Sequence, residues 1–409
     1  MKRIKIKTLL FTFALCAPLV AAQNRLDPTL VAVLGGGLSA GYSGFRLVEQ
    51  TQRQAWPSLV ARQMGTILPL PTFRDDGAAG VINAFRPLPG LLPVVSQSGE
   101  RGLPFPIFAL NLSVPFLRVG ESLTLRPHPQ YDGPKLIAAI EGDLKTSLVN
   151  AILGGPLLTL TDPVLLSQTE YAEMLSPTMV FVELGFGDVL DAALQGNAPL
   201  ITPASSFQTE YGEVIRRMAA THASVIALTV PDPLDAGYFA TIDELAQKYG
   251  VAAEALRDRF HLASGDMLTL GGMLEIGDAL RGRRGSTLSP GSVVPAAVVT
   301  AIHAAVAAYN AAVQSAAGNA GVKVFDLGGF LHPLRSAALQ AGHFTAGGGY
   351  GAGFYSEDGI YPSATGQALI ANAVIQFLNA QFGASFAPID SEAVAANDPA
   401  IVASHGAAR

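Results

Sequence analysis

Cysteine is almost absent from this chain. The single one among 409 residues, Cys16, lies in an apolar stretch near the N-terminus that we expect to be removed. The mature protein would then have no disulfide, no thiol nucleophile and no thiolate metal ligand. Charge is scarce as well. Charged residues make up 14% of the sequence, and no block of one sign forms an acidic or basic tail.

Histidines at the spacing of metal ligands are also missing. The seven histidines are scattered, with no His-x-x-x-His or Glu-His pair, so we expect no metal. Gly35 to Ala40 fits the loose Gly-x-Gly-x-x-Ala form of a dinucleotide turn. However, no second strand ends in an acidic residue at the right distance, and the lysine of a phosphate-binding loop is absent. We therefore expect no cofactor.

Residues 1–22 have the pattern of a secretory signal peptide. A basic start is followed by an apolar core over residues 8–20 and by small residues that end at Ala22. The apolar core is short for a membrane anchor, which needs about 20 residues, and Leu15 before Cys16 argues against a lipid anchor. We expect cleavage after Ala22 and a secreted, periplasmic or cell-surface protein.

The mature chain would be acidic. Removal of the signal leaves 22 basic residues against 32 acidic ones, a net charge of −10. Nucleic-acid binding requires a basic surface, so nucleic acid is not an expected partner. We recognise no other apolar run that is long and uninterrupted enough to cross a membrane.

Five short apolar runs predict buried strands, and helical patterns lie between them. The predicted strands are 30–34, 108–115, 178–185, 224–230 and 322–327. The main predicted helices are 56–65, 203–220, 242–257, 294–317 and 364–382. This alternation predicts an α/β fold with a doubly wound parallel sheet of about five strands.

One large domain accounts for most of the sequence. We place it at residues 23–388, with long loop insertions near 66–107 and 235–292, where glycine and proline are frequent and periodicity is weak. The segment 389–409 is rich in alanine and polar residues, and we expect it to be loosely ordered.

The turn after the first predicted strand resembles the first block of the SGNH/GDSL hydrolases, a superfamily of serine esterases and lipases. Their pattern is Gly-Asp-Ser-Leu-Ser-x-Gly, and this chain has Gly35 to Gly41 in that frame. Ser39 matches the second serine of the pattern. Gly36 replaces the aspartate, and Gly37 replaces the nucleophilic serine.

Three later blocks carry the same resemblance in the family's order. Residues 111–115 match Asn-Leu-x-Val-Pro, but Phe116 follows where the family has an oxyanion-binding glycine. Gly187 stands where the family's asparagine donates to the oxyanion. The closing block Asp-x-x-His-Pro matches Asp358 to Pro362, with Tyr361 in place of the histidine.

The resemblance implies a flavodoxin-like three-layer fold and, in intact members, acyl transfer to serine. Histidine takes the proton, aspartate orients the histidine, and two donors stabilise the oxyanion. Gly37 has no hydroxyl, and Tyr361, with an ordinary pKa of about 10, is no base near neutral pH. Losing one oxyanion donor costs roughly 10² to 10³ in kcat. We therefore expect a pseudo-hydrolase that binds an acyl or glycan-like ligand or acts as a scaffold.

Several residues leave alternatives open. The alternative function is an active esterase or lipase that uses Ser39 as a displaced nucleophile and His343 as base. If Ser39 is not a nucleophile, it caps the start of a helix. Asp358 is either the remnant of the catalytic acid or a turn residue, and His332 reads as a loop histidine. Tyr361 either packs the emptied pocket or lines a binding site. Protein partners of the long insertions stay open too.

Overall fold

The computed structural model describes residues 26–73, 108–128, 144–154 and 165–406. The predicted signal peptide and most of the predicted insertion at 66–107 lie outside these ranges.

A four-stranded parallel sheet forms the centre of the fold. Its strands are β1 (Val31–Gly35), β2 (Met179–Glu183), β3 (Ser224–Leu228) and β7 (Lys323–Phe325), in the order β1-β2-β3-β7. Every residue of β1 and β2 is buried, as expected for apolar strands covered on both faces. The prediction of an α/β fold with a parallel sheet is thus confirmed.

The expected fifth strand is only a bridge. The segment 108–115 runs parallel to β1 and forms one bridge with it, Val33 with Asn111, through three backbone hydrogen bonds of 2.9 to 3.0 Å between residues 110–114 and residues 33–35. The backbone N–H of Leu110, which a longer ladder would direct to β1, donates to the carbonyl of Pro69 instead, at 2.8 Å, so the pairing does not extend toward the start of β1. Counted with this segment, the strand order is 2-1-3-4-5, which is the order of flavodoxin-like sheets.

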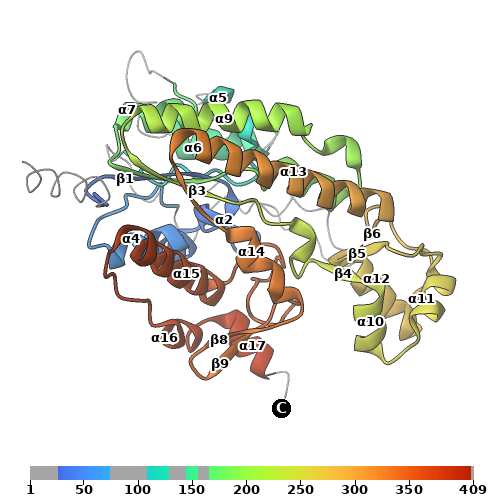
Figure 1. The fold of residues 1–409 in the computed structure, drawn as a ribbon. Helices are drawn as coiled ribbons and strands as arrows, with labels where there is room; N and C mark the ends of the chain where they lie inside the picture. The colour runs from blue at the N-terminus through green and yellow to red at the C-terminus, as the bar shows by residue number, and fades with distance from the viewer. Residues whose placement is uncertain (1–25, 74–107, 129–143, 155–164, 407–409) are drawn as a thin grey trace, which may run out of the picture.

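Helices cover both faces of the sheet (Figure 1). On one side lie α4 (Trp56–Gln63) and α15 (Ala364–Phe382), which pack against each other. On the other side lie α9 (Ala204–Ala220) and α13 (Ala296–Ala320). These two helices are in contact through the stacked rings of Phe207 in α9 and Tyr309 in α13. The result is a three-layer arrangement.

Helix α13 has 25 residues and contains an 18-residue stretch with a mean hydropathy of 1.6, so by length and composition alone it could cross a membrane. This differs from the sequence-based expectation, which recognised no such segment. In the structure one stripe of α13 is buried, mainly against α9 and α8 (Gly187–Gln195). Such a one-sided stripe is typical of a helix on the surface of a globular core.

The predicted insertion at 235–292 is not irregular, which corrects the expectation. Three short antiparallel strands, β4 (Phe239–Thr241), β5 (Met267–Thr269) and β6 (Val293–Val294), form a second sheet. Three helices pack beside it: α10 (Ile242–Tyr249), α11 (Ala253–Phe260) and α12 (Leu270–Leu280). The single helix expected at 242–257 is interrupted because Gly250 adopts φ +65° and ends α10. We call this unit the lobe; it lies at one end of α13 in Figure 1.

The segment after Pro388 is also better ordered than expected. It forms α16 (Ser391–Ala395) and α17 (Pro399–Gly406). Ile401 is fully buried, and the Asp398 carboxylate accepts a hydrogen bond of 2.7 Å from the backbone N–H of Thr365 in the first turn of α15. The C-terminal segment therefore packs on the domain.

The remaining helices and strands are short. They are α2 (Gly37–Ala40), α3 (Glu49–Gln54), α5 (Val119–Thr124), α6 (Leu144–Leu153), α7 (Gln168–Leu175), α14 (Leu327–Leu331), β8 (Leu339–Ala341) and β9 (Phe344–Ala346), with 3₁₀ turns η2 (Ala198–Leu200), η3 (Pro233–Asp235) and η4 (His332–Arg335).

Candidate functional site

Four positions, at which the resemblance places the catalytic serine, glycine, asparagine and histidine, meet at the carboxyl ends of β1 and β2. We call Gly37, Phe116, Gly187 and Tyr361 the quartet. Open α/β sheets bind ligands at this edge, where the strand order reverses. The structure therefore brings together residues that are more than 300 positions apart in sequence.

The ring of Tyr361 occupies the space beside Gly37. A Cβ atom built on Gly37 would lie 2.5 Å from Cζ and 2.6 Å from Oη of Tyr361. Real Cβ atoms do not approach other heavy atoms this closely. Any side chain at position 37, a serine included, would collide with the tyrosine unless the ring moved.

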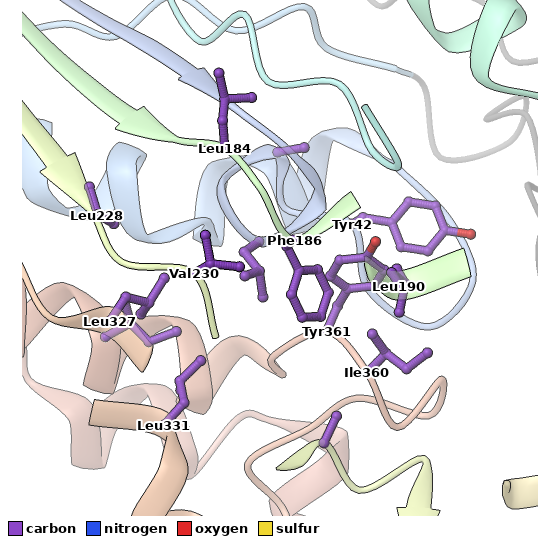
Figure 2. Packing of buried hydrophobic residues seen from close by; sticks show 14 of the residues in the cluster. Tyr42, Leu184, Phe186, Leu190, Leu228, Val230, Leu327, Leu331, Ile360 and Tyr361 are labelled. Carbon is purple, nitrogen blue, oxygen red and sulfur yellow. The ribbon is translucent and has the colours of Figure 1, made fainter. Parts of the chain in front are cut away.

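Tyr361 is the centre of an aromatic cluster. It is 0% exposed, and its ring lies edge-on to those of Tyr42, Phe116 and Phe186, with centroids 5.1, 6.1 and 6.2 Å away. Figure 2 shows Tyr42, Phe186 and Tyr361 packed together at this point. Within the described part of the chain, the Tyr361 hydroxyl has no hydrogen-bond partner. The cluster is therefore an apolar plug.

Phe116 adopts a backbone conformation that suits glycine. Its φ is +66°, in the left-handed region, which costs a residue with a side chain roughly 1–2 kcal/mol. The aligned position in the family is a glycine, for which this conformation carries no penalty. The Phe116 ring packs on Tyr42 at 5.5 Å, which offsets part of the cost.

Gly187 has no room for a side chain. A Cβ there would lie 2.9 Å from the carbonyl carbon of Leu117 and 3.0 Å from the carbonyl oxygen of Phe116. Both atoms belong to the backbone, so they do not move aside as a flexible side chain would. An asparagine at this position would require the 116–117 segment to shift.

Asp358 closes a turn. One of its carboxylate oxygens accepts hydrogen bonds from the backbone N–H groups of Ile360 and Tyr361, both at 2.8 Å. The other accepts a longer one, 3.4 Å, from the N–H of Phe45. Burial raises the pKa of Asp358, and these hydrogen bonds partly oppose that effect. The carboxylate thus holds the tyrosine-proline corner, and among the described residues no imidazole is bonded to it.

Ser39 and His343, the candidate displaced pair, have separate partners. The hydroxyl of Ser39 is fully buried and donates to Glu183 Oε2 at 2.7 Å. The His343 side chain is 90% exposed and pairs with Glu392 of α16. The structure does not bring these two side chains into contact. His332, which the sequence suggests is a loop histidine, pairs with Asp235 at 2.8 Å.

The Glu183 carboxyl is a buried polar group near this cluster that the sequence reasoning missed. Glu183 ends β2, and its Oε2 also accepts from the backbone N–H of Gly36 at 3.0 Å. Ser39 Oγ shares a further hydrogen bond of 2.9 Å with Ser113 Oγ. Burial raises the pKa of Glu183 to about 7, against the opposing effect of Ser39 and Gly36. The available signal was one acidic residue within an apolar strand.

These contacts limit the chemistry of the centre. One hydroxyl, Ser39, meets one carboxyl, Glu183, but both are buried and no imidazole is bonded to either among the described residues. An acyl-transfer centre needs a nucleophile, a base and oxyanion donors open to the substrate. No set of three or more side chains suited to binding a metal ion occurs in the part of the chain that the structure describes.

Comparison with known proteins gives only distant similarities. No protein-family model and no curated protein matches the chain. Among solved structures, it is similar to the psychrotrophic esterase EstA from Pseudoalteromonas sp., with 12% identity, a TM-score of 0.36, and coverage of 88% of this chain and 100% of the esterase. A second similarity is to LAE5, an α/β hydrolase from the metagenome of Lake Arreo, Spain, with 12% identity, a TM-score of 0.36, and coverage of 87% and 98%. At these values neither similarity assigns a family or an activity.

Proposed function

We propose that this protein is a secreted member of the SGNH/GDSL superfamily that no longer catalyses ester hydrolysis. The observation that carries the proposal is the position of Tyr361, whose ring fills the space that a nucleophile on residue 37 would need. Its phenol is buried, and burial raises its pKa well above the ordinary value, so it is not a base.

Three observations support the family assignment within this proposal. The strand order, counted with the bridged segment, is that of a flavodoxin-like sheet. The blocks that resemble the family lie at one edge of the sheet, as a shared site requires. Phe116 keeps a glycine-type backbone at the position of the family's glycine.

The role that remains is binding or assembly. A pseudo-hydrolase of this kind would act by holding an acyl or glycan-like ligand, or as a scaffold for a protein partner. The lobe adds surface to the domain where β6 contacts α8 and β4 contacts η3, and we assign such a role to it.

A second candidate, an esterase that uses Ser39, has one observation in its favour. Ser39 donates to Glu183, and a carboxyl with a pKa of about 7 is suited to general base catalysis near neutral pH. Against it, Ser39 and Glu183 lie beneath the plug and are closed to solvent.

A fluorophosphonate probe and p-nitrophenyl esters separate these functions. We expect no stoichiometric labelling of the mature protein and no ester turnover above that of buffer. Labelling of one serine, together with turnover that is lost in Ser39→Ala, would overturn the proposal in favour of the esterase. Ser58→Ala is a matched control, because Ser58 is also buried but donates only to the backbone carbonyl of Gln52.

A further inference from the structure

A cleft of about 240 Å³ lies between the lobe and the main-domain segments that carry Asp235, Arg335 and Tyr350. Phe239, Glu244 and Lys248 of the lobe line one wall. Asp235 and Tyr350 of the main domain line the other. The cleft is separate from the plug, because none of its lining residues belongs to the quartet.

The two walls are joined by one charged contact. Arg335 donates to Glu244 across the cleft at 2.5 Å and also to the backbone carbonyl of Leu234. The Asp235 carboxylate pairs with His332 through one oxygen, and a carboxylate can accept several hydrogen bonds. The cleft thus offers fixed acceptors and fixed donors within one small volume.

The charges that line the cleft balance. Two acidic side chains, Asp235 and Glu244, face two basic ones, Lys248 and Arg335. An acyl chain would have to bury four charged groups against hydrocarbon, which is unfavourable. A phosphate or another anion would meet two carboxylates. A neutral ligand with many hydroxyl groups fits best, because each hydroxyl both donates and accepts.

An aromatic ring completes the lining. Tyr350 is 39% exposed, and its hydroxyl donates to the carbonyl of Glu357 at 3.3 Å. A Cβ on Gly359 would lie 3.0 Å from its Cδ2, so the ring rests closely on that glycine. The negative face of an aromatic ring attracts polarised C–H groups, which the apolar face of a pyranose presents.

We propose that this cleft binds a saccharide, with the C–H face of one sugar ring on Tyr350 and its hydroxyl groups paired with Asp235, Glu244 and Arg335. The proposal does not depend on whether the quartet is inert, because none of its residues lines the cleft. It gives Asp358 a positioning role, since Asp358 shapes the turn on which Tyr350 rests.

Isothermal titration and saturation-transfer NMR of the full mature chain would test the proposal. The probes are glucose, galactose, mannose, xylose and N-acetylglucosamine. We expect saturable binding of at least one of them, with a Kd on the order of 1 mM for a ligand of this size. Tyr350→Ala should weaken binding at least about tenfold, and Asp235→Asn should also weaken it.

Two matched controls separate binding from folding. Phe108→Ala removes a ring of similar exposure, 46%, outside the cleft. Glu392→Gln disrupts another carboxylate–histidine pair, Glu392 with His343, which does not line the cleft. Both controls should bind the sugar as the wild type does, and thermal unfolding should show that all four variants fold.

Three results would contradict the proposed saccharide site. The proposal is overturned if none of the sugars binds, if glycine or inorganic phosphate binds in preference to all of them, or if Tyr350→Ala binds as tightly as Phe108→Ala. Ester turnover remains a separate measurement, so failure here leaves the proposed loss of catalysis untouched.

Discussion

The contact between Gly37 and Tyr361 makes a quantitative prediction for the free energy of unfolding. Gly37 begins α2 without a positive φ, so an alanine there should stabilise the backbone by about 0.5–1 kcal/mol if space were free. Its Cβ would instead lie 2.5 Å from Tyr361 Cζ. Overpacking of this kind costs about 1–3 kcal/mol. We therefore expect Gly37→Ala to destabilise the protein by about 1–2 kcal/mol.

The same substitution should behave differently once the ring is shortened. Tyr361→Leu removes the atoms that approach residue 37 while it keeps the site apolar. In that background Gly37→Ala should be neutral or stabilising by about 0.5 kcal/mol. The double-mutant cycle should then give a coupling of about 2 kcal/mol, near the upper part of the range for residues in contact.

Urea unfolding of the four proteins measures this coupling from the midpoints at constant m. Gly36→Ala is the control, because its Cβ would lie 3.9 Å from the Glu183 carboxylate, an ordinary contact. It should change stability by no more than about 0.5 kcal/mol. A coupling near zero, with Gly37→Ala equally tolerated in both backgrounds, would show that the ring does not occupy the space beside residue 37.

Three further predictions concern the same centre. Tyr361→Phe should raise the free energy of unfolding by about 1 kcal/mol, because it removes a buried hydroxyl without a partner among the described residues. A lower free energy of unfolding in urea would contradict this, since it would show that the hydroxyl makes a stabilising hydrogen bond. Burial raises the pKa of Glu183 from 4.5 to about 7, so the folded state binds this proton more tightly than the unfolded state. Stability should therefore fall by about 3 kcal/mol between pH 4.5 and 7, and Glu183→Gln should lose less over that range; unchanged pH profiles would contradict this. Gly37→Ser with Tyr361→His should hydrolyse p-nitrophenyl esters at least roughly 10² to 10³ times more slowly than an ordinary esterase, because Gly187 supplies no side-chain donor to the oxyanion. Turnover at an ordinary enzymatic rate would refute that reasoning.

The parts of the fold that the sequence predicts are those with strong apolar patterns. β1, β2 and β3 are runs of apolar residues, and α15 begins and ends at the residues that its pattern indicates, Ala364 and Phe382. The segment 108–115 has the same apolar character, yet the carbonyl of Pro69 accepts the hydrogen bond from Leu110 N–H that would extend the pairing with β1. A competing acceptor outside the sheet leaves no trace in the pattern of the strand.

The candidate site shows a similar division. The motif frame indicates which residues replace the catalytic ones, but it says nothing about the space between Gly37 and Tyr361. The hydrogen bonds of Glu183 depend on the third dimension, as does the pairing of His332 with Asp235 across 97 residues. The order of the lobe was missed because its three strands have only two or three residues each, too few for a period to be recognised.

The bond between Asp398 and the first turn of α15 has a practical consequence. Tyr361 lies only a few residues before that turn, so the last helices of the chain act as a brace for the aromatic plug from outside. Shortening the protein at its C-terminus, or fusing a bulky tag next to Ile401, would weaken this support. Either change would then disturb the aromatic cluster around Tyr361, although neither alters a residue of that cluster.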